Sequence, residues 1–284
     1  MQRLTDVSYV KQIMEENGIR FQKKFGQNFL ITPEVPARIA DECGAKPEDG
    51  ILEIGPGIGT LTECLCERYR KVVAIEIDDA LVRILPDTLS RFDNVTVLHE
   101  DAMKTDLGAL LAEQFDGMRV TVCANLPYYI TTPILLKLLE SRLPFDNITV
   151  MIQREVADRL AALPGTADYG AVTLAVAYYA EAEKLFRVSP GNFLPPPKVD
   201  STVIRLKMRK EPICPVQNEA QMFRLIRAAF DQRRKTLLNA LTSGCPSFSK
   251  EQISAAIEAV GMRPDIRGEK LSVADFARLS DQLC

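Results

Sequence analysis

The pattern of apolar and polar positions changes its period along the chain. Residues 6–17 and 33–43 place apolar side chains at helical spacing, which predicts two amphipathic helices near the start. From residue 50 onward, short apolar runs typical of buried strands alternate with amphipathic stretches typical of helices. Such alternation predicts a parallel sheet that is covered by helices on both faces, an α/β fold. The expected strands are 51–54, 72–75, 95–98, 120–124, 148–153, 184–188 and 202–207, the last two as an antiparallel pair at the sheet edge, and the expected helices between them are 60–69, 79–90 and 132–141.

The pattern becomes purely helical in the last quarter of the chain. Four helices are expected there, over residues 219–230, 235–241, 250–260 and 272–283. We therefore expect two domains. Residues 1–209 hold an N-terminal segment and the sheet, and residues 210–284 form a small all-helical domain.

Composition narrows the classes of protein that remain. The 284 residues are 46% hydrophobic and 26% charged, and no apolar run or leader-like N-terminus suggests a membrane span or export, so a cytoplasmic protein is expected. The seven cysteines show no C-x-x-C spacing and there is a single histidine, so we expect no metal site and no histidine-based triad. The net charge of −3 means that any nucleic-acid contact must rest on local basic clusters.

Glycines and acids follow three of the expected strands. The run Glu53-Ile-Gly55-Pro-Gly57-Ile-Gly59 comes directly after the first strand, where glycines let the backbone approach a nucleoside closely. Glu76 ends the second strand and can accept from ribose hydroxyls. Asp101, followed by Ala102, ends the third strand and is placed to bind an adenine amino group. The first two features suit a nicotinamide cofactor as well as S-adenosylmethionine, and the third favours S-adenosylmethionine.

The fourth strand ends in Asn125-Leu126-Pro127-Tyr128, the most specific signal in the chain. An aromatic exocyclic amine is a poor nucleophile because its lone pair is delocalised into the ring. The side-chain oxygen of Asn125 and a backbone carbonyl at Leu126 or Pro127 can accept its two N–H groups and stabilise the positive charge that it acquires. Proline stiffens the turn, and Tyr128 can stack on a base that has left its strand. The motif therefore predicts methylation of an amino group.

Several longer motifs carry a family resemblance. The stretches KKFGQNFL, EIGPGIGTLT, EDAM, NLPYYITTP, MIQREVADRL, NFLPPPKVDS and FDQRRKTLLNAL together closely resemble the ribosomal RNA adenine dimethylase family of the KsgA/RsmA type. They cover most of the chain. The resemblance implies a Rossmann-like methyltransferase domain that uses S-adenosylmethionine, and dimethylation of two adjacent adenosines near the 3′ end of 16S ribosomal RNA during ribosome maturation.

The resemblance also implies roles for individual residues. Phe193 aligns with an aromatic side chain that sandwiches the target base opposite Tyr128, although a core phenylalanine beside a rigid proline run is the alternative. The positions that match the family's contacts to S-adenosylmethionine, with their immediate neighbours in the loops, are Asn28, Leu30, Gly55, Gly57, Glu76, Asp101, Ala102 and Asn125.

Local charge fits an RNA partner. Between residues 198 and 235 there are ten basic and four acidic residues, a local net charge of 10 − 4 = +6, which suits phosphate contacts. The expected partner is small-subunit ribosomal RNA within the pre-30S particle, bound by a monomer without membrane contact. The candidate RNA-binding residues are Lys23, Lys24, Lys198 and the patch Arg233-Arg234-Lys235 at a helix start.

Three other hypotheses remain open from the sequence. An antibiotic-resistance type of enzyme that methylates large-subunit RNA would share the glycine loop and the Asn125 motif, but the stretches QRRKTLLNAL and PPPKVDS favour the small subunit. A non-catalytic assembly factor would have no need of Asn125, Glu76 and Asp101. A nicotinamide oxidoreductase would share only the glycine loop and the first acid.

Overall fold

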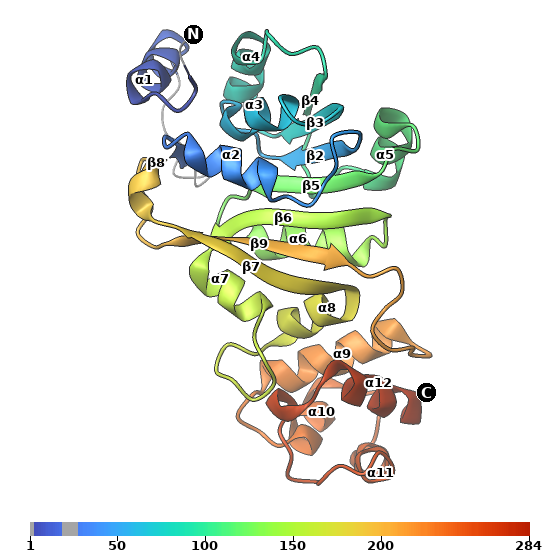
Figure 1. Cartoon of the computed structure of the whole chain (residues 1–284). Coiled ribbons are helices and arrows are strands. Elements are labelled where there is room, and N and C mark those ends of the chain that lie inside the picture. Colours follow the sequence, from blue (N-terminus) through green and yellow to red (C-terminus); the bar gives the residue numbers. More distant parts are fainter. Residues whose placement is uncertain (1–2, 19–27) are drawn as a thin grey trace. The chain divides into compact units, whose positions relative to one another are not determined.

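The computed structural model describes residues 3–18 and 28–284 (Figure 1). The chain folds into two compact units. Unit 1 comprises Met1–Ala157 and Glu183–Met208, and unit 2 comprises Asp158–Ala182 and Arg209–Cys284. Within the described residues, no helix has the length and apolar character that a membrane crossing requires.

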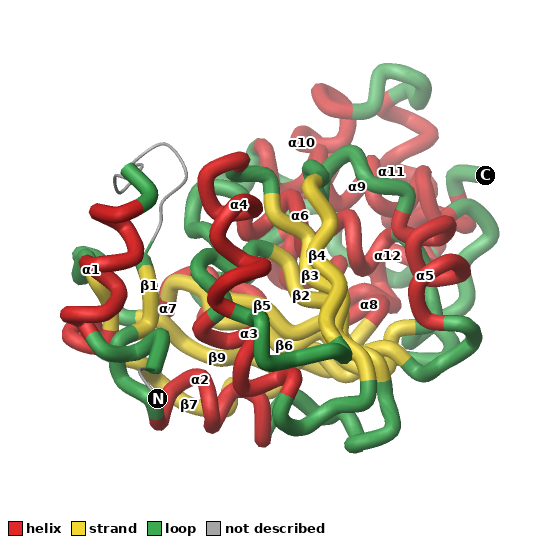
Figure 2. Tube along the Cα trace, turned by 90° about the horizontal axis from the view of Figure 1, so that it is seen from above, coloured by secondary structure: helices red, strands yellow, loops and turns green. Residues whose placement is uncertain are grey.

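Unit 1 is built on a seven-stranded sheet in the order β4-β3-β2-β5-β6-β9-β7. The five strands from β4 to β6 are parallel, as the alternating pattern predicted. Figure 2 shows the strands crossing the unit with α3 and α4 beside them. All seven predicted strands are confirmed with ends that differ by up to four residues: β2 Gly50–Ile54, β3 Lys71–Glu76, β4 Val95–His99, β5 Val120–Asn125, β6 Phe145–Gln153, β7 Ala180–Val188 and β9 Ser201–Met208.

The last two strands close the sheet at one edge, as predicted. Strand β9 is antiparallel to β6 and is the hydrogen-bonded neighbour of β7. Three ion pairs connect residues on or beside these two strands. Arg187 contacts Asp200, Arg205 contacts Glu183 at 2.6 Å, and Arg209 contacts Glu181 at 3.0 Å. From one ion pair to the next, the residue number on the β7 side falls while that on the β9 side rises. The two strands are therefore antiparallel.

The helices of unit 1 follow from amphipathic stretches with local caps. The side chain of Asp6 accepts from the amides of Ser8 and Tyr9, and that of Asp78 from the amide of Ala80, so each caps a helix. Helix α5 and the short α7, which directly follows β6, were not predicted. The helices are α1 Val7–Glu16, α2 Glu34–Asp41, α3 Thr60–Cys66, α4 Asp79–Thr88, α5 Leu107–Phe115, α6 Thr131–Glu140 and α7 Arg154–Leu160, whose end continues into unit 2.

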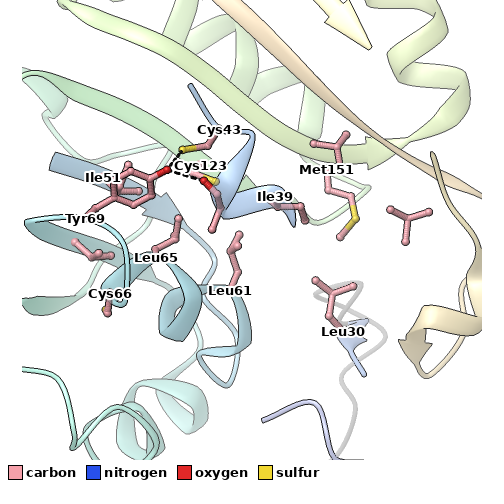
Figure 3. Packing of buried hydrophobic residues seen from close by; sticks show 14 of the residues in the cluster. Leu30, Ile39, Cys43, Ile51, Leu61, Leu65, Cys66, Tyr69, Cys123 and Met151 are labelled. Atoms are coloured by element: carbon pink, nitrogen blue, oxygen red, sulfur yellow. Dashed lines mark hydrogen bonds between the residues drawn. The ribbon is translucent and has the colours of Figure 1, made fainter. Parts of the chain in front are cut away.

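An apolar cluster of buried side chains lies beneath α2 and α3 (Figure 3). Side chains such as Ile39 and Leu65 pack there against β2 and β5 and are fully buried. Two of the polar side chains inside are linked by hydrogen bonds, since Cys43 Sγ donates to Tyr69 Oη at 3.2 Å and that hydroxyl donates to the Ala40 carbonyl at 2.6 Å. All seven cysteines of the protein are free thiols.

A two-stranded sheet joins segments that are far apart in sequence. Strand β1, Phe29–Leu30, pairs antiparallel with β8, Phe193–Leu194, so that Leu30 lies opposite Phe193. A short 3-10 turn, Pro190–Asn192, precedes β8, and the Asn192 carbonyl accepts from the Ile31 amide at 2.9 Å. This pairing places residues 29–30 beside the proline-rich stretch that follows β8.

Unit 2 is helical, as predicted for the last quarter of the chain, but it begins earlier. Residues 158–182 belong to it, although the predicted boundary was near residue 209. The reason is α8, Ala171–Tyr179, which is apolar on nearly all sides and must be buried. Tyr178 packs edge-to-face against Phe223, and Tyr179 stacks on the same ring. The hydroxyls of both tyrosines donate to Glu219. The remaining helices are α9 Glu219–Asp231, α10 Leu237–Gly244, α11 Lys250–Ala259 and α12 Val273–Gln282.

Candidate active site

A pocket in unit 1 forms where the carboxyl ends of the parallel strands meet. The loop after β2, the last residue of β3, the loop after β4 and the end of β5 contribute Gly55, Glu76, Asp101 and Asn125 to its lining. Ligands of open α/β sheets bind at this end of the strands. All eight residues predicted to contact a cofactor line this one pocket, including Asn28 and Leu30 from the N-terminal segment, Gly57 and Ala102.

The glycine loop depends on backbone conformations that favour glycine. Gly55, Gly57 and Gly59 all have positive φ, between 65° and 96°. A Cβ on Gly57 would also lie 3.1 Å from the ring of Phe29, which lines the pocket. The loop therefore presents bare backbone to the pocket for both conformational and steric reasons.

Glu76 is held in place by three backbone amides. Its Oε1 accepts from the amides of Ile77 and Asp78 at 2.8 and 2.9 Å, and its Oε2 accepts from the amide of Gly57 at 3.2 Å. A carboxylate has about four acceptor positions, so at least one remains for a ligand hydroxyl. Burial raises the pKa of Glu76, and the three amides oppose that rise.

Glu53 is a pocket residue to which the sequence interpretation gave no role. Its side chain lines the pocket, is 1% exposed, and leaves Oε2 without a hydrogen-bond partner in the described structure. Burial, with a contribution from the nearby Glu76 charge, raises the pKa of Glu53 to about 8. Its position at the end of β2, just before the glycine loop, was the signal that could have identified it.

The lining of the pocket has a pronounced charge bias. It contains four acids and, among the residues that the structure describes, no lysine, arginine or histidine. An acid-lined, half-closed pocket favours a cationic ligand and disfavours an anionic one such as a pyrophosphate. The four acids are Glu53, Glu76, Glu100 and Asp101.

The turn Asn125–Tyr128 is anchored at every residue. The Leu126 amide donates to the Met151 carbonyl at 3.2 Å, and the Pro127 carbonyl accepts from the Ile130 amide at 3.2 Å and Thr131 Oγ1 at 3.0 Å. Among the described residues, none donates to the Leu126 carbonyl. Of the two backbone acceptors considered from the sequence, Leu126 therefore has the open oxygen.

The side chain of Asn125 is oriented from the N-terminal segment. Its Nδ2 lies 3.4 Å from the Asn28 carbonyl, to which it donates. This contact engages the amide nitrogen and leaves the side-chain oxygen as the group that can accept from a ligand.

Two adjacent tyrosines line the pocket in different ways. The Tyr128 hydroxyl is 2.6 Å from Oγ of the buried Ser201 on β9, which sets the direction of the ring. Tyr129 is 57% exposed, and its pKa is raised by partial burial and by the charges of Asp101 and Glu76. In the sequence Tyr129 carries no signal that separates a pocket residue from an exposed surface residue. Only the tertiary structure identifies it as part of this site.

Phe193 does not lie where the sequence interpretation placed it. Its side chain is 2% exposed, packs in the apolar cluster beneath α2, and is not among the described residues that line the pocket. The pairing of β8 with β1 directs it inward. Its position is that of a core phenylalanine and does not support a second wall for a base opposite Tyr128.

The predicted RNA-binding residues are distributed over both units. Lys23 and Lys24 lie outside the described residues, and Lys198 is exposed in unit 1. Arg234 and Lys235 are exposed in the turn between α9 and α10, because α10 begins only at Leu237 with Thr236 as its N-cap. Basic side chains are unfavourable inside a first helical turn, and threonine is a favourable cap.

Arg233 has contacts within its own unit. It pairs with Glu269 at 2.9 Å and donates to the carbonyls of Thr166 and Ala167 at 2.9 and 2.6 Å. Arg205 and Arg209 likewise pair with acids that lie outside residues 198–235. The local net charge of +6 counted from the sequence is therefore partly neutralised in the folded chain.

The parallel sheet, the glycine loop, the strand-end acids and the anchored Asn-Leu-Pro-Tyr turn define a Rossmann-like domain of the methyltransferase class. Comparison with known families makes this more specific. Residues 18–283 match the family described as ribosomal RNA adenine dimethylase. The chain belongs to this family, as the resemblance of its motifs indicated.

Close relatives cover nearly the whole chain. A protein of Anoxybacillus flavithermus named ribosomal RNA small subunit methyltransferase A is 51% identical over 96% of this chain and 94% of its own length. A protein of the same name from Alkaliphilus metalliredigens is 46% identical over 100% of this chain and 99% of its own.

Two solved structures are similar in fold. A dimethyladenosine transferase from Plasmodium falciparum matches with a TM-score of 0.74 and 28% identity, over 88% of this chain and 95% of that one. The 23S rRNA methyltransferase ErmE matches with a TM-score of 0.66 and 26% identity, over 90% and 99%. Both agree with the predicted fold class.

Proposed function

We propose that this chain transfers methyl groups from S-adenosylmethionine to the exocyclic amines of two adjacent adenosines near the 3′ end of 16S ribosomal RNA. The observation that carries the proposal is the turn Asn125–Tyr128, which presents two open acceptors at the wall of an acid-lined pocket. The relatives named ribosomal RNA small subunit methyltransferase A support the choice of subunit.

The pocket residues fit S-adenosylmethionine better than a dinucleotide. This cofactor carries a sulfonium and an ammonium group, which suit a lining of four acids without a described basic residue. Glu76 would accept from the ribose and Asp101 from the adenine amine, while the glycine loop admits the nucleoside at close range. S-adenosylmethionine supplies an activated methyl group, and the pyrophosphate of NAD would be repelled by the same acids.

The catalytic turn acts on the target amine. The Asn125 side-chain oxygen and the Leu126 carbonyl accept its N–H groups, which draws them out of the plane of the base and stabilises the charge that develops on nitrogen. Asn28 and Thr131 hold these acceptors in place through Asn125 and Pro127. The methylated ammonium is acidic, so its proton can leave to water without a histidine base.

Tyr128 supplies a stacking surface for the extruded adenine. Its ring borders the pocket, and the 2.6 Å contact to Ser201 fixes its direction. A base that is flipped out of an RNA strand gains back part of its lost stacking on such a ring. The second methyl transfer requires rotation about the carbon–nitrogen bond, because a monomethylated amine has one N–H for two acceptors.

The RNA partner is proposed to be the pre-30S particle, met in the cytoplasm by a monomer. Exposed Lys198, Arg234 and Lys235 would contact phosphates, together with Lys23 and Lys24. The helical residues 210–284, which belong to unit 2, would contribute the RNA-binding surface, and unit 1 would be catalytic.

Methyl transfer measured on defined substrates tests the proposal. The protein is incubated with labelled S-adenosylmethionine and either unmethylated small subunits or naked large-subunit RNA, and the modified nucleosides are identified by mass. We expect dimethyladenosine in the small subunit only. Preference for large-subunit RNA, as in the enzyme type of ErmE, would replace the proposed substrate, and the absence of transfer to either would favour an assembly factor without chemistry.

A further inference from the structure

Lys137 on α6 reaches the loop that follows β4. Its Nζ donates to the Ala102 carbonyl at 2.8 Å and to the Thr105 carbonyl at 2.7 Å. Both carbonyls belong to the tight turn after Asp101, in which the amides of Lys104 and Thr105 already donate to the Asp101 carbonyl. One ammonium therefore satisfies two carbonyls that the turn itself leaves unpaired.

The Ala102–Met103 peptide connects this contact to the Asp101 side chain. Its carbonyl oxygen accepts from Lys137, and its N–H, on Met103, donates to Asp101 Oδ1 at 2.9 Å. Because a peptide unit is planar, fixing its oxygen also fixes the direction of its N–H. Through this peptide, Lys137 therefore fixes the direction of the N–H group that holds the Asp101 carboxylate.

The other end of α6 is tied to the catalytic turn. Thr131, the first residue of the helix, donates to the Pro127 carbonyl, and Ile134, one turn before Lys137, lines the pocket. Helix α6 thus contacts the catalytic turn at its start and the Asp101 loop through Lys137.

We propose that Lys137 is a positioning residue that orients Asp101 toward the adenine amine of the cofactor. The inference rests on the role proposed above for Asp101. A hydrogen bond from a charged donor is stronger than a neutral one, so the ammonium holds the turn more firmly than a neutral side chain would. Lys137 is not among the described residues that line the pocket, and it acts on Asp101 through the carbonyls of the turn, chiefly that of the Ala102–Met103 peptide.

Discrimination between two ligands provides the test. Dissociation constants are measured by calorimetry for S-adenosylhomocysteine and for S-inosylhomocysteine, in which an oxygen replaces the adenine amine. The wild type is expected to prefer the amine. In Lys137→Met the preference should fall by about tenfold, the value of one hydrogen bond to a charged group. The ratio of the two constants does not depend on the folded fraction of the sample.

Three further variants serve as controls. Lys137→Arg keeps the donors and should keep the preference within about threefold of wild type. Lys104→Met removes the 85% exposed lysine that lies 3.8 Å from Asp101 Oδ2 and should leave the preference unchanged. In an Asp101→Asn background, Lys137→Met should have no further effect on the preference.

The outcomes separate the two proposals. An unchanged preference in Lys137→Met, or an equal loss in Lys137→Arg, overturns the positioning role while leaving the proposed function intact. A wild type that binds neither ligand, or that does not distinguish them, overturns the adenine contact of Asp101 and with it this inference. A loss in Lys137→Met that Arg restores supports it.

Discussion

The two walls of the pocket are held in different ways. The cofactor-facing wall is held locally at Glu76, since this carboxylate is fixed by amides of its own strand end and of the glycine loop, 19 residues away at most. The target-facing wall is held from far along the chain. Asn125 contacts a carbonyl 97 residues away, and Tyr128 contacts a serine 73 residues away.

This difference separates binding from chemistry. A wall made of backbone amides tolerates change elsewhere in the chain, and its loss should affect affinity. A wall made of side chains supported from distant segments requires the complete fold of unit 1, and its loss should affect turnover. Each of the following variants weakens one wall and leaves the other in place.

The largest effect is expected for Asn125→Ala. It removes the side-chain acceptor from the target-facing wall and should lower methyl transfer by about 10²-fold or more, as for loss of other transition-state acceptors or donors. RNA binding, measured by filter retention, should be preserved. Gln12→Ala, which changes an exposed amide on α1 away from the pocket, serves as the control. Undiminished turnover in Asn125→Ala would contradict the role proposed for this residue.

Glu76→Ala weakens the opposite wall. The ribose acceptor is lost and three amides are left without their partner, so the dissociation constant for S-adenosylmethionine should rise by about 10- to 100-fold. Turnover at saturating cofactor should change much less. Titration calorimetry and steady-state kinetics measure the two effects, with exposed Glu113→Ala as control. A loss confined to turnover would remove the contrast between the walls.

The variant Glu53→Gln tests whether the buried Glu53 carboxyl, beside the cofactor-facing wall, makes the stability of the protein depend on pH. Folding raises the pKa of Glu53 from 4.5 to about 8. Between these values the unfolded chain loses the proton while the folded chain keeps it, so this group lowers stability as pH rises and has no effect below about pH 4.5. The free energy of unfolding of the variant should therefore match that of wild type near pH 5. Toward pH 8 the variant should become more stable than wild type, and the difference should grow by at most about 1.4 kcal/mol per pH unit.

Chemical denaturation of the ligand-free protein at several pH values measures this difference. A stability gain that is the same at pH 5 and pH 8 would mean that Glu53 does not titrate in this range. Above about pH 8, where Glu53 carries a negative charge, the variant should also bind S-adenosylmethionine more weakly than wild type, and below that pH the two should bind alike.

The smallest effect is expected for Ser201→Ala. Only the contact to the Tyr128 hydroxyl is lost, about 1 kcal/mol, so turnover should fall about fivefold with unchanged cofactor affinity. Tyr128→Phe should give a similar loss, and the double variant should be no worse than either single one. Additive losses would show that the two residues act independently.

The sequence predicted the central sheet well because its signals are local. Buried strands read as apolar runs, and the acids and glycines that follow them are placed at one sheet edge by the rule that parallel strands end together. That rule brought Gly55, Glu76, Asp101 and Asn125 together without any tertiary information, and the pocket confirms it.

Other features could not be read from local patterns. Helix α8 is apolar throughout, so it has no helical periodicity to recognise, and its burial moved residues 158–182 into unit 2. Arg233 belongs to a basic run in the sequence, yet its partner Glu269 lies 36 residues away. Phe193 looked like a pocket residue because of its motif, and strand pairing with Leu30 placed it in the core.

The sequence by itself determined the fold class, the family and the set of residues that meet at the carboxyl edge of the sheet. These depend on periodicity and on short motifs, which a linear chain displays directly. The tertiary structure alone decided which backbone carbonyl is open among the described residues, which way Asn125 and Tyr128 point, that Glu53 is buried with its Oε2 unpaired in the described part of the chain, and that Lys137 reaches the Asp101 turn. These depend on contacts between segments that are distant in sequence, and such contacts exist only after the chain has folded.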